Sequence, residues 1–391
     1  MTIPPSSQCS FQKAEPQPAK ARYIMVGGFL GAGKTTAVAR LARHLADQGQ
    51  RVGLITNDQG NQLVDTALLT SHGFAVEEIA GGCFCCRFPS LMEAARKLSA
   101  ESRPDVFIAE PVGSCTDLVA TVSYPLRRIY GDDFTVAPLS VLVDPIRARR
   151  VLGLAAGGGF SEKVRYIYRK QLEEADLIVI NKCELLEPAA LAELRRSLAT
   201  QFPRAELLEI SARQGAGLEP WFNQIASTRQ KAGTAMEIDY QVYAEGEALL
   251  GWLNATLQVT SPSPRDGNAL LRQLAGEIQA RLQTVGAEIA HLKMTLDPEE
   301  GLGGLAVINL VRNDWVPELS QELEDPFQSG QIIINIRAET PPERLRAAVV
   351  EGLAACAGNG SDLSLTLAHL EFFQPGKPEP THRVTELEEE D

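Results

Sequence analysis

Gly28-Phe29-Leu30-Gly31-Ala32-Gly33-Lys34-Thr35 is the most informative stretch of the sequence. It fits the pattern G-x-x-x-x-G-K-[ST], in which a glycine-rich loop turns its backbone N–H groups toward phosphate oxygens. The apolar run at residues 23–26 precedes it as a predicted buried strand, and Val38, Leu41 and Leu45 follow it at helical spacing. A strand before the loop and a helix after it distinguish a phosphate-binding loop from a chance glycine-rich turn.

This loop predicts a nucleotide-binding site with an associated metal ion. Lys34 would reach the β- and γ-phosphates, and the Thr35 hydroxyl would bind Mg²⁺. The start of the following helix adds a partial positive charge. We expect the nucleotide to be held by Gly28, Gly31, Ala32, Gly33, Lys34, Thr35 and Thr36.

Short apolar runs alternate with helical patterns through the first half of the chain, at residues 23–26, 52–56, 106–109, 139–143, 177–180 and 207–210. This alternation predicts an α/β domain of the P-loop NTPase type, with a mostly parallel sheet covered by helices. Ligands of such sheets bind at the carboxyl ends of the strands. The residues that follow these strands are therefore candidates for the site.

Three carboxylates follow predicted strands, at Asp58, Glu110 and Asp144. Mg²⁺ prefers oxygen ligands, so we expect Asp58 and Glu110 to complete the metal shell begun by Thr35 and to support hydrolysis together with Lys34. Asp144 is a third candidate from its position at a strand end. The alternative for each is a solvated loop carboxylate.

Asn181-Lys182-Cys183-Glu184 follows the predicted strand at 177–180 and resembles the N-K-x-D element with which GTPases read guanine. The carboxylate of that element accepts hydrogen bonds from the ring N1–H and the exocyclic amino group of guanine, a donor pair that adenine lacks there. Here Glu184 replaces the aspartate, which preserves the chemistry and changes the reach. Ser211 and Ala212 resemble the loop that backs the base. The alternative for Asn181-Lys182 is an ordinary helix cap.

Gly81-Gly82-Cys83-Phe84-Cys85-Cys86 contains three of the seven cysteines of the chain. Thiolates this close in sequence can gather on one soft metal ion, such as Zn²⁺, Co²⁺ or Cu(I). Three ligands leave a fourth position open, as a transfer site requires. We therefore predict Cys83, Cys85 and Cys86 as metal ligands; the alternatives are inert buried cysteines or a redox-active pair.

Composition narrows the classes of partner. The 391 residues carry a net charge of −13, and an acidic balance disfavours non-specific binding to nucleic acid. No apolar run reaches the roughly 18 residues of a membrane helix, and the N-terminal residues lack the apolar core of a secretory signal. With an odd, clustered set of cysteines, we expect a cytoplasmic protein with no nucleic-acid or membrane partner.

A polar stretch around Gly233 separates two halves of different periodicity. Strand patterns at 250–260, 288–296, 305–311, 331–336 and 363–373 alternate with helical patterns at 268–284 and 342–356, which predicts a smaller α+β domain of ferredoxin-like type. We expect a disordered leader over residues 1–21, a P-loop GTPase domain over 22–230, the α+β domain over 238–376 and an acidic tail over 377–391, with 386–391 solvated and mobile.

Four segments together resemble the CobW-type metallochaperone GTPases, a family related to the nickel-inserting GTPases of urease and hydrogenase. They are the loop from Gly28 to Thr36, the G-G-C-x-C-C segment at 81–86, an E-x-x-G element from Glu110 to Gly113, and Asn181 to Glu184. Two features depart from the family pattern. Asn57-Asp58-Gln59-Gly60 stands where the family has Asn-Glu-x-Gly, and a His-rich stretch is replaced by five scattered histidines.

The resemblance implies slow GTP hydrolysis coupled to delivery of Zn²⁺ or Co²⁺ to a client metalloprotein or a metal-cofactor pathway, with GTP or GDP and Mg²⁺ as cofactors. It also allows for a nucleotide-dependent homodimer. A second function that fits the same residues is a GTP-dependent assembly or reactivation factor that senses metal without transferring it. A third, a P-loop kinase or partition-type ATPase, is disfavoured by Asn181-Lys182. We expect the C-terminal domain to recognise the client.

Overall fold

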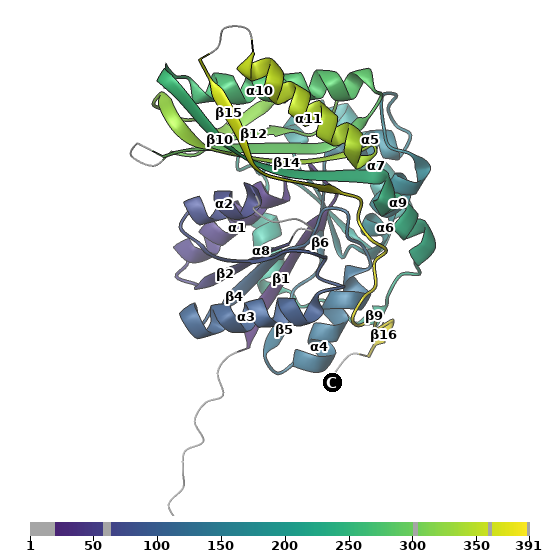
Figure 1. Ribbon diagram of the computed structural model, residues 1–391. Helices are drawn as coiled ribbons and strands as arrows, with labels where there is room; N and C mark the ends of the chain where they lie inside the picture. The colour runs from purple at the N-terminus through teal and green to yellow at the C-terminus, as the bar shows by residue number, and fades with distance from the viewer. Residues whose placement is uncertain (1–19, 58–63, 300–303, 359–361, 389–391) are drawn as a thin grey trace, which may run out of the picture.

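A computed structural model describes residues 20–57, 64–299, 304–358 and 362–388 (Figure 1). Two sheets with their helices account for most of the chain, one in each half. Asp58 and residues 1–19 of the predicted leader lie outside the described residues.

The first sheet contains eight strands, in the order β3-β2-β4-β1-β6-β7-β8, with β5 also paired to β1. Every pair in it is parallel, which confirms the predicted mostly parallel sheet. Its strands are β1 (Ala21–Gly28), β2 (Val52–Asn57), β3 (Ala75–Ile79), β4 (Val106–Glu110), β5 (Phe134–Val136), β6 (Ser140–Val143), β7 (Leu177–Ile180) and β8 (Glu206–Glu209).

Helices cover both faces of this sheet, so its strands are apolar on both sides. They are α1 (Lys34–Asp47), α2 (Val64–Ser71), α3 (Phe88–Ser102), α4 (Tyr124–Tyr130), α5 (Pro145–Val151), α6 (Glu162–Glu174), α7 (Pro188–Gln201) and α8 (Leu218–Ser227), with short helical turns at Val119–Ser123 and Cys183–Leu185. In β1, Tyr23 and Met25 join the core that contains α3 and α6, whereas Ile24 and Val26 join the core that contains α1 and α8. This double burial explains the uninterrupted apolar run before the P-loop.

The second sheet is antiparallel and contains six strands, in the order β13-β12-β11-β14-β10-β15. Helices α10 and α11 pack on one face of it through residues such as Leu274 and Val349 (Figure 1). The order β15-β10-β14-β11, with a helix after β10 and after β14, is the predicted ferredoxin-like arrangement, and β12 and β13 extend it. The elements are β10 (Leu250–Arg265), α10 (Gly267–Thr284), β11 (Glu288–Pro298), β12 (Ala306–Leu310), β13 (Glu318–Gln321), β14 (Phe327–Glu339), α11 (Pro342–Ala357) and β15 (Ser364–Phe373).

The other face of the second sheet lies over the first domain, above α1 and α2 in Figure 1. The backbone N–H of Val64, at the start of α2, donates to Asn335 Oδ1 of β14 over 2.9 Å. The Val64 side chain packs with Leu305 and Val307 in a small apolar cluster. The second sheet is therefore placed against the end of the first sheet where the P-loop lies.

The chain returns to the first domain after β15, as the yellow trace in Figure 1 shows. Near its end β16 (Glu386–Leu387) pairs with β9 (Gly233–Thr234). The sequence analysis did not predict this pairing of Glu386 and Leu387, because the partner strand comes from the distant segment at 233–234. Between the domains, α9 (Tyr240–Leu249) packs on α6, where a Cβ on Gly246 would lie 2.5 Å from Lys163 O.

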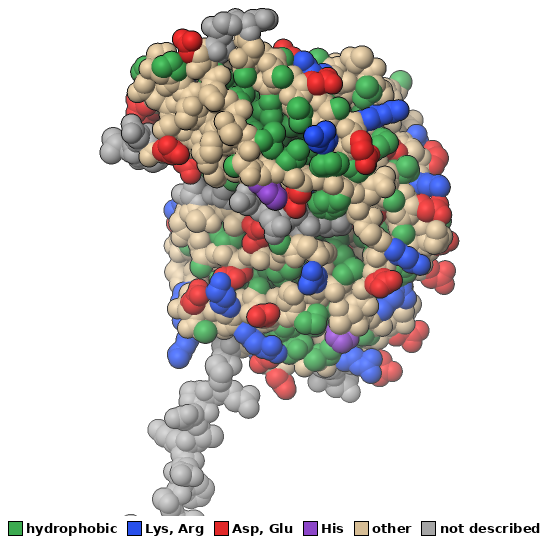
Figure 2. All heavy atoms as spheres, in the orientation of Figure 1, with side chains coloured by type: hydrophobic (Ala, Val, Ile, Leu, Met, Phe, Trp, Pro, Cys, Tyr) green, Lys and Arg blue, Asp and Glu red, His purple; other side chains and the backbone are tan. Residues whose placement is uncertain are grey.

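Acidic and basic side chains are interspersed over both domains on the face shown in Figure 2. Within the described ranges, no helix combines the length and the apolar character that a bilayer crossing requires.

Candidate functional site

The P-loop joins β1 to α1 in a conformation that depends on glycine. Gly28, Gly31 and Gly33 have φ angles of 126°, 78° and 89°, which residues with a side chain rarely adopt. A Cβ on Gly33 would also lie 2.5 Å from Asn181 Nδ2. Lys34 is buried, and its Nζ donates to Gly28 O over 2.9 Å, so the ammonium group lies across the loop that would hold the phosphates.

Thr35 and Glu110, two predicted Mg²⁺ ligands, lie together. Thr35 Oγ1 donates to Glu110 Oε1 over 3.0 Å. Glu110 is the last residue of β4, which pairs with β1, and only 5% of it is exposed. The parallel neighbours β1 and β4 thus bring the two oxygen donors to the same end of the sheet. Ala32 is buried in the same loop, and Thr36 is exposed at the first turn of α1.

Asn181 connects the P-loop to the predicted base-binding loop. Its Nδ2 donates to Ala32 O over 2.8 Å, and its Oδ1 accepts from the backbone N–H of Ala212 over 2.9 Å. Lys182 Nζ donates to Gly31 O over 2.8 Å. The end of β7 is therefore in direct contact with the P-loop.

Ser211 and Glu184 differ in exposure. Ser211 is buried, and its Oγ accepts a hydrogen bond from the backbone N–H of Gln214 over 3.1 Å, which shapes the loop after β8. Glu184 is exposed in the short helical turn after Lys182. Its carboxylate is accessible to a ligand at this edge of the domain.

Asp144 lies on the Lys182 side of the site rather than beside Thr35. It caps α5 by accepting from the backbone N–H of Arg147 over 3.0 Å, and it pairs with Lys182 over 2.9 Å and with Arg312 over 3.4 Å. Burial alone would raise the pKa of Asp144. The positive charges of Lys182 and Arg147 outweigh this effect and lower the pKa to about 2. Its position therefore fits a buried structural carboxylate.

The predicted metal ligands converge in the loop between β3 and α3. The sulfur of Cys83 lies 2.7 Å from that of Cys85 and 3.2 Å from that of Cys86, and the sulfurs of Cys85 and Cys86 are 3.7 Å apart. Cys83 and Cys85 are buried, and Cys86 is half-buried. Among the described residues this is the one group of three or more Cys, His, Asp or Glu ligand atoms that fits a metal ion.

Asn57, the last residue of β2, fixes this loop. Its Nδ2 donates to Gly82 O over 2.6 Å and to Ile79 O over 2.9 Å, and its Oδ1 accepts from the backbone N–H of Phe84 over 2.9 Å. Three hydrogen bonds from one amide hold the backbone on both sides of Cys83. A buried amide at a strand end thereby sets the position of the thiols.

Cys115 is a fourth cysteine at this cluster, and the sequence reasoning gave it no role. It is 1% exposed, and its thiol is hydrogen-bonded to Cys83 and Cys85. Hydrogen bonds from Cys115 and from the other thiols hold the pKa of Cys83 well below its ordinary value, and burial raises the pKa of Cys115. The cluster thus favours one thiolate, at Cys83, surrounded by neutral thiols. Residue 115 follows Glu110 in one loop, and that proximity was the available signal.

The C-terminal segment covers the cysteine loop. The backbone N–H of Thr381 donates to Cys85 O over 2.9 Å, and Thr381 Oγ1 donates to Cys86 O over 3.1 Å. Arg383 pairs with the buried Asp117 over 2.8 Å, two residues beyond Cys115. We call residues 374–388 the strap, because they run from β15 across the thiol cluster to β16 (Figure 1).

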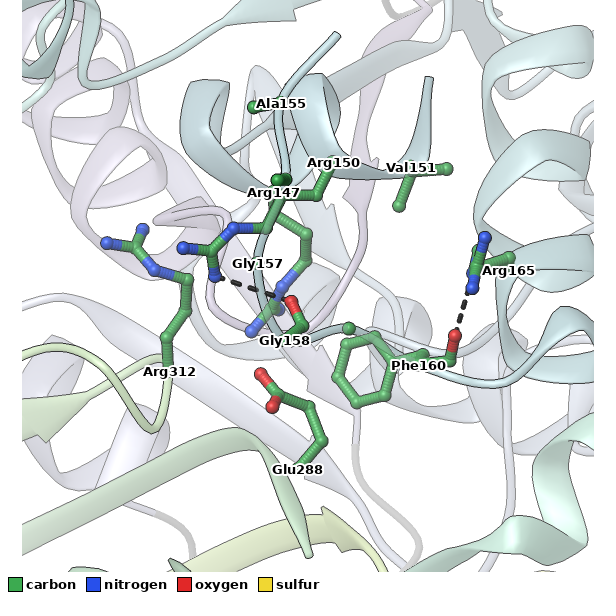
Figure 3. Close-up of a pocket in the computed structure, with 12 residues that line it drawn as sticks. Arg147, Arg150, Val151, Ala155, Gly157, Gly158, Phe160, Arg165, Glu288 and Arg312 are labelled. Atoms are coloured by element: carbon green, nitrogen blue, oxygen red, sulfur yellow. Dashed lines mark hydrogen bonds between the residues drawn. The ribbon is translucent and has the colours of Figure 1, made fainter. Parts of the chain in front are cut away.

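A charged pocket of about 290 Å³ lies between α5 and the second sheet. Figure 3 shows Arg147 and Arg150 of α5 facing Glu288 and Arg312 across it. Arg150 and Arg312 both pair with Asp314. The Arg150–Asp314 pair links the two domains, whereas the Arg312–Asp314 pair lies within the second domain.

Comparisons with known proteins agree with this geometry. The CobW/HypB/UreG nucleotide-binding domain family matches residues 22–209. A zinc chaperone named CobW from Sinorhizobium sp. is 28% identical over 225 residues, covering 50% of this chain and 60% of the relative. The zinc chaperone YeiR of Escherichia coli K12 is 32% identical over 178 residues, covering 45% of this chain and 50% of that protein. The chain thus spans little more than half the length of these curated relatives.

A probable GTPase of Mycobacterium tuberculosis, Rv1496, is 24% identical over 280 residues, covering 68% of this chain and 77% of that protein. Among solved structures, the hydrogenase maturation factor HypB of Archaeoglobus fulgidus is 22% identical, covers 52% of this chain and 87% of its own, and has a TM-score of 0.36. The sequence match and the P-loop geometry agree on the same segment. Residues 22–209, which form the P-loop domain, are thus a nucleotide-binding domain of the CobW/HypB/UreG type.

Proposed function

We propose that the chain is a GTP-hydrolysing metallochaperone that carries one Zn²⁺ or Co²⁺ ion on Cys83, Cys85 and Cys86 and delivers it to a client metalloprotein or metal-cofactor pathway. One observation carries this proposal: the thiol cluster and the P-loop lie at the same end of one sheet. Glu110 and Asn57 end the adjacent strands β4 and β2. Glu110 contacts Thr35, and Asn57 holds the cysteine loop. The zinc chaperones among the relatives support the choice of cargo.

The donor set fits a thiophilic ion. The three sulfur atoms lie within 4.8 Å of one another, and soft thiolates favour Zn²⁺ and Co²⁺ over Mg²⁺. Hydrogen bonds to the Cys115 thiol raise the pKa of Cys85 well above its ordinary value, and the hydrogen bond to Cys83 raises the pKa of Cys86 to about 11. Metal loading must therefore release protons, and it weakens in acid.

Mg²⁺ and GTP are assigned to the P-loop. Thr35 and Glu110 offer the oxygen donors that Mg²⁺ prefers, with Asp58 proposed as a further one, and Lys34 faces the phosphates. Asn181 and Glu184 are proposed to read guanine, with Ser211 and Ala212 behind the base. Competition of GTP and ATP for one site tests this assignment, because equal competition would remove the basis for a guanine reader.

The two sites are coupled through the loop that follows β4. Glu110 contacts Thr35 at the start of this loop, and Cys115 contacts the thiol cluster further along it. Gln171 Nε2 donates to Gly113 O over 3.0 Å and to Cys115 O over 2.8 Å, which makes the loop a single braced unit. When Mg²⁺–GTP changes the partner of Glu110, the loop transmits the change to the sulfur atoms. By linkage, metal then alters GTP affinity by the same factor.

A second candidate function, sensing metal without transfer, is favoured by the burial of the thiols. Cys83 is 5% exposed and Cys85 1%, and the strap lies over them. A closed site of this kind suits a GTP-dependent assembly or reactivation factor. The C-terminal domain, which has no metal-ligating cluster among its described residues, is assigned to client recognition in both cases.

One experiment separates these functions. The purified chain is loaded with Zn²⁺, mixed with an apo acceptor protein, and given GTP, a non-hydrolysable analogue or GDP, with zinc in each protein measured after separation. Transfer that requires hydrolysis supports the chaperone. Retention of zinc in all three nucleotide states supports the sensor instead. The Cys83→Ser, Cys85→Ser, Cys86→Ser triple variant, which should retain GTP binding and lose tight metal binding, is the control.

A further inference from the structure

The second sheet reaches the P-loop through one lysine. Lys293 lies on β11, and its half-buried ammonium group donates to Thr35 Oγ1 over 3.3 Å. The same hydroxyl donates to Glu110 Oε1 over 3.0 Å. A positive charge from the C-terminal domain therefore lies beside the hydroxyl that we assign to Mg²⁺.

The strand that carries Lys293 is held in contact with the P-loop backbone. Leu292 and Met294 belong to the core beneath α10 and α11, so Lys293 lies on the opposite face of β11, toward the first domain. A Cβ on Gly31 would lie 3.1 Å from Ala290 O. Because the P-loop and β11 are this close, a movement of the P-loop backbone must displace β11.

A buried arginine fixes the same contact. Arg147, on α5, donates to Leu30 O of the P-loop and to Val311 O of the second sheet, and also to Ala290 O over 3.1 Å. One guanidinium group thus binds carbonyls from both domains. These hydrogen bonds hold the strand of Lys293 beside the P-loop.

The surroundings of Lys293 suit a polyanion. His291, next on the same face of β11, is 7% exposed, and its Nε2 has no hydrogen-bond partner in the described part of the chain. Burial, with the nearby charge of Lys293, lowers the pKa of His291 well below its ordinary value, so the ring is neutral. The charge of Lys34 acts on the same ring, so ammonium groups from both domains gather here.

We propose that Lys293 binds the terminal phosphate of the bound nucleoside triphosphate and makes the contact between the two domains depend on the nucleotide. The proposal rests on the proposed function only in assigning a nucleotide to the P-loop. When Mg²⁺ takes the Thr35 hydroxyl, the ammonium group must leave it, and the terminal phosphate is the anion that the ligand brings. GDP lacks this phosphate, so Lys293 discriminates the triphosphate from the diphosphate.

The test compares Lys293→Met, which keeps the length of the side chain and removes its charge, with Lys293→Arg and with Lys97→Met. Lys97 is exposed on α3 and paired with Glu77 over 2.6 Å, far from the P-loop in sequence. Affinities for a fluorescent non-hydrolysable GTP analogue and for fluorescent GDP are measured with Mg²⁺ on the full chain. The loss of one charge-assisted hydrogen bond predicts about a tenfold or greater loss for the GTP analogue in Lys293→Met, little change for GDP, and recovery in Lys293→Arg.

Hydrogen exchange of the β11 amides gives a second measurement. If Lys293 had only a structural role, its substitution would not change how the exchange rates depend on the nucleotide. In the wild type these amides should exchange differently with the GTP analogue than with GDP, and the difference should vanish in Lys293→Met. Equal losses for both nucleotides, or tighter GTP binding by Lys293→Met, would overturn the proposal. If Lys293→Met does not fold, Lys293→Gln replaces it with the same expectations. A wild-type protein that binds no guanine nucleotide would refute the proposed function. A Lys293→Met variant that still distinguishes the GTP analogue from GDP as the wild type does would refute only this inference.

Discussion

The backbone N–H of Glu379 donates a hydrogen bond to Cys86 Sγ over 3.3 Å, although 293 positions separate the two residues. Cys86 is the one half-buried thiol of the cluster, and the strap lies at this point of access. A backbone donor to sulfur stabilises a thiolate or a bound metal and restricts exchange with solvent. The strap therefore belongs to the metal site as well as to the fold.

Weakening the strap should open the cluster. Arg383→Ala removes the ion pair with Asp117, and a chain ending at Gly376 removes the strap contacts with Cys85 and Cys86. We expect alkylation of Cys86 and release of zinc to a chelator to accelerate by about tenfold or more in both variants. Arg383→Lys, which retains the charge, should lie between Arg383→Ala and the wild type. Unchanged rates in the truncated chain would mean that the strap is no barrier.

Cys115 should influence both acidity and metal affinity. Cys115→Ala removes a hydrogen-bond donor to Cys83, so the pKa of Cys83 should rise toward its ordinary value, and zinc affinity should fall by about tenfold or more. Ultraviolet thiolate absorbance over a pH titration measures the first effect, and chelator competition the second. Cys356→Ala, in the core of the second domain, is the matched control. Equal behaviour of the two variants would exclude Cys115 from the site.

Glu110 should act on hydrolysis more than on binding. Glu110→Gln keeps the shape of the side chain and removes the negative charge near Thr35, so the hydrolysis rate should fall on the order of a hundredfold while GTP affinity changes little. Single-turnover kinetics separates the two quantities. Glu193→Gln is the control, because Glu193 is half-buried and pairs with Arg149 over 2.8 Å rather than with Thr35. A normal rate in Glu110→Gln would remove this carboxylate from the mechanism.

Glu174 should make stability depend on pH. Burial, with the charge of Asp117, raises its pKa from 4.5 to about 8, and its carboxyl group accepts from Thr116 Oγ1 and from the backbone N–H of Val119. Between pH 4.5 and about 8, the Glu174 carboxyl group is protonated in the folded state and ionised in the unfolded chain. Its stabilising contribution is therefore present below pH 4.5 and lost as the pH rises through about 8.

Urea unfolding across this pH range measures the effect. The wild type should lose roughly 1.4 kcal/mol per pH unit from this group, and Glu174→Gln should show a flatter profile. Parallel profiles for the two proteins would contradict the assignment of the buried proton to Glu174.

Much of the architecture could be predicted from local sequence patterns. The apolar run before Gly28 and the helical spacing after Thr35 predicted the P-loop and its neighbours, because propensity and periodicity act over short distances. Apart from β13, the strands and helices from Leu250 to Phe373 were predicted for the same reason. Five strands were missed, namely β3, β5, β9, β13 and β16, because each has five residues or fewer and is stabilised by pairing with a partner strand.

The site itself could be predicted only in part. Cys83, Cys85 and Cys86 are adjacent in sequence and were expected together, whereas Cys115, Glu379 and Lys293 reach the same end of the sheet through tertiary packing. Asp144 illustrates the opposite case. Its strand-end position suggested a nucleotide or metal role. The structure pairs it with Lys182 and Arg312, and no local sequence pattern predicts those partners.

The central claim is that the nucleotide state sets the metal affinity of the thiol cluster. It is tested most directly by titrating the full chain with Zn²⁺ against a chromophoric chelator, once with a non-hydrolysable GTP analogue and once with GDP. Coupling between the sites predicts two affinities that differ by about fivefold or more. The Cys83→Ser, Cys85→Ser, Cys86→Ser triple variant should bind zinc weakly in both states and nucleotide normally. Identical zinc affinities in the two nucleotide states of the wild type would contradict the account.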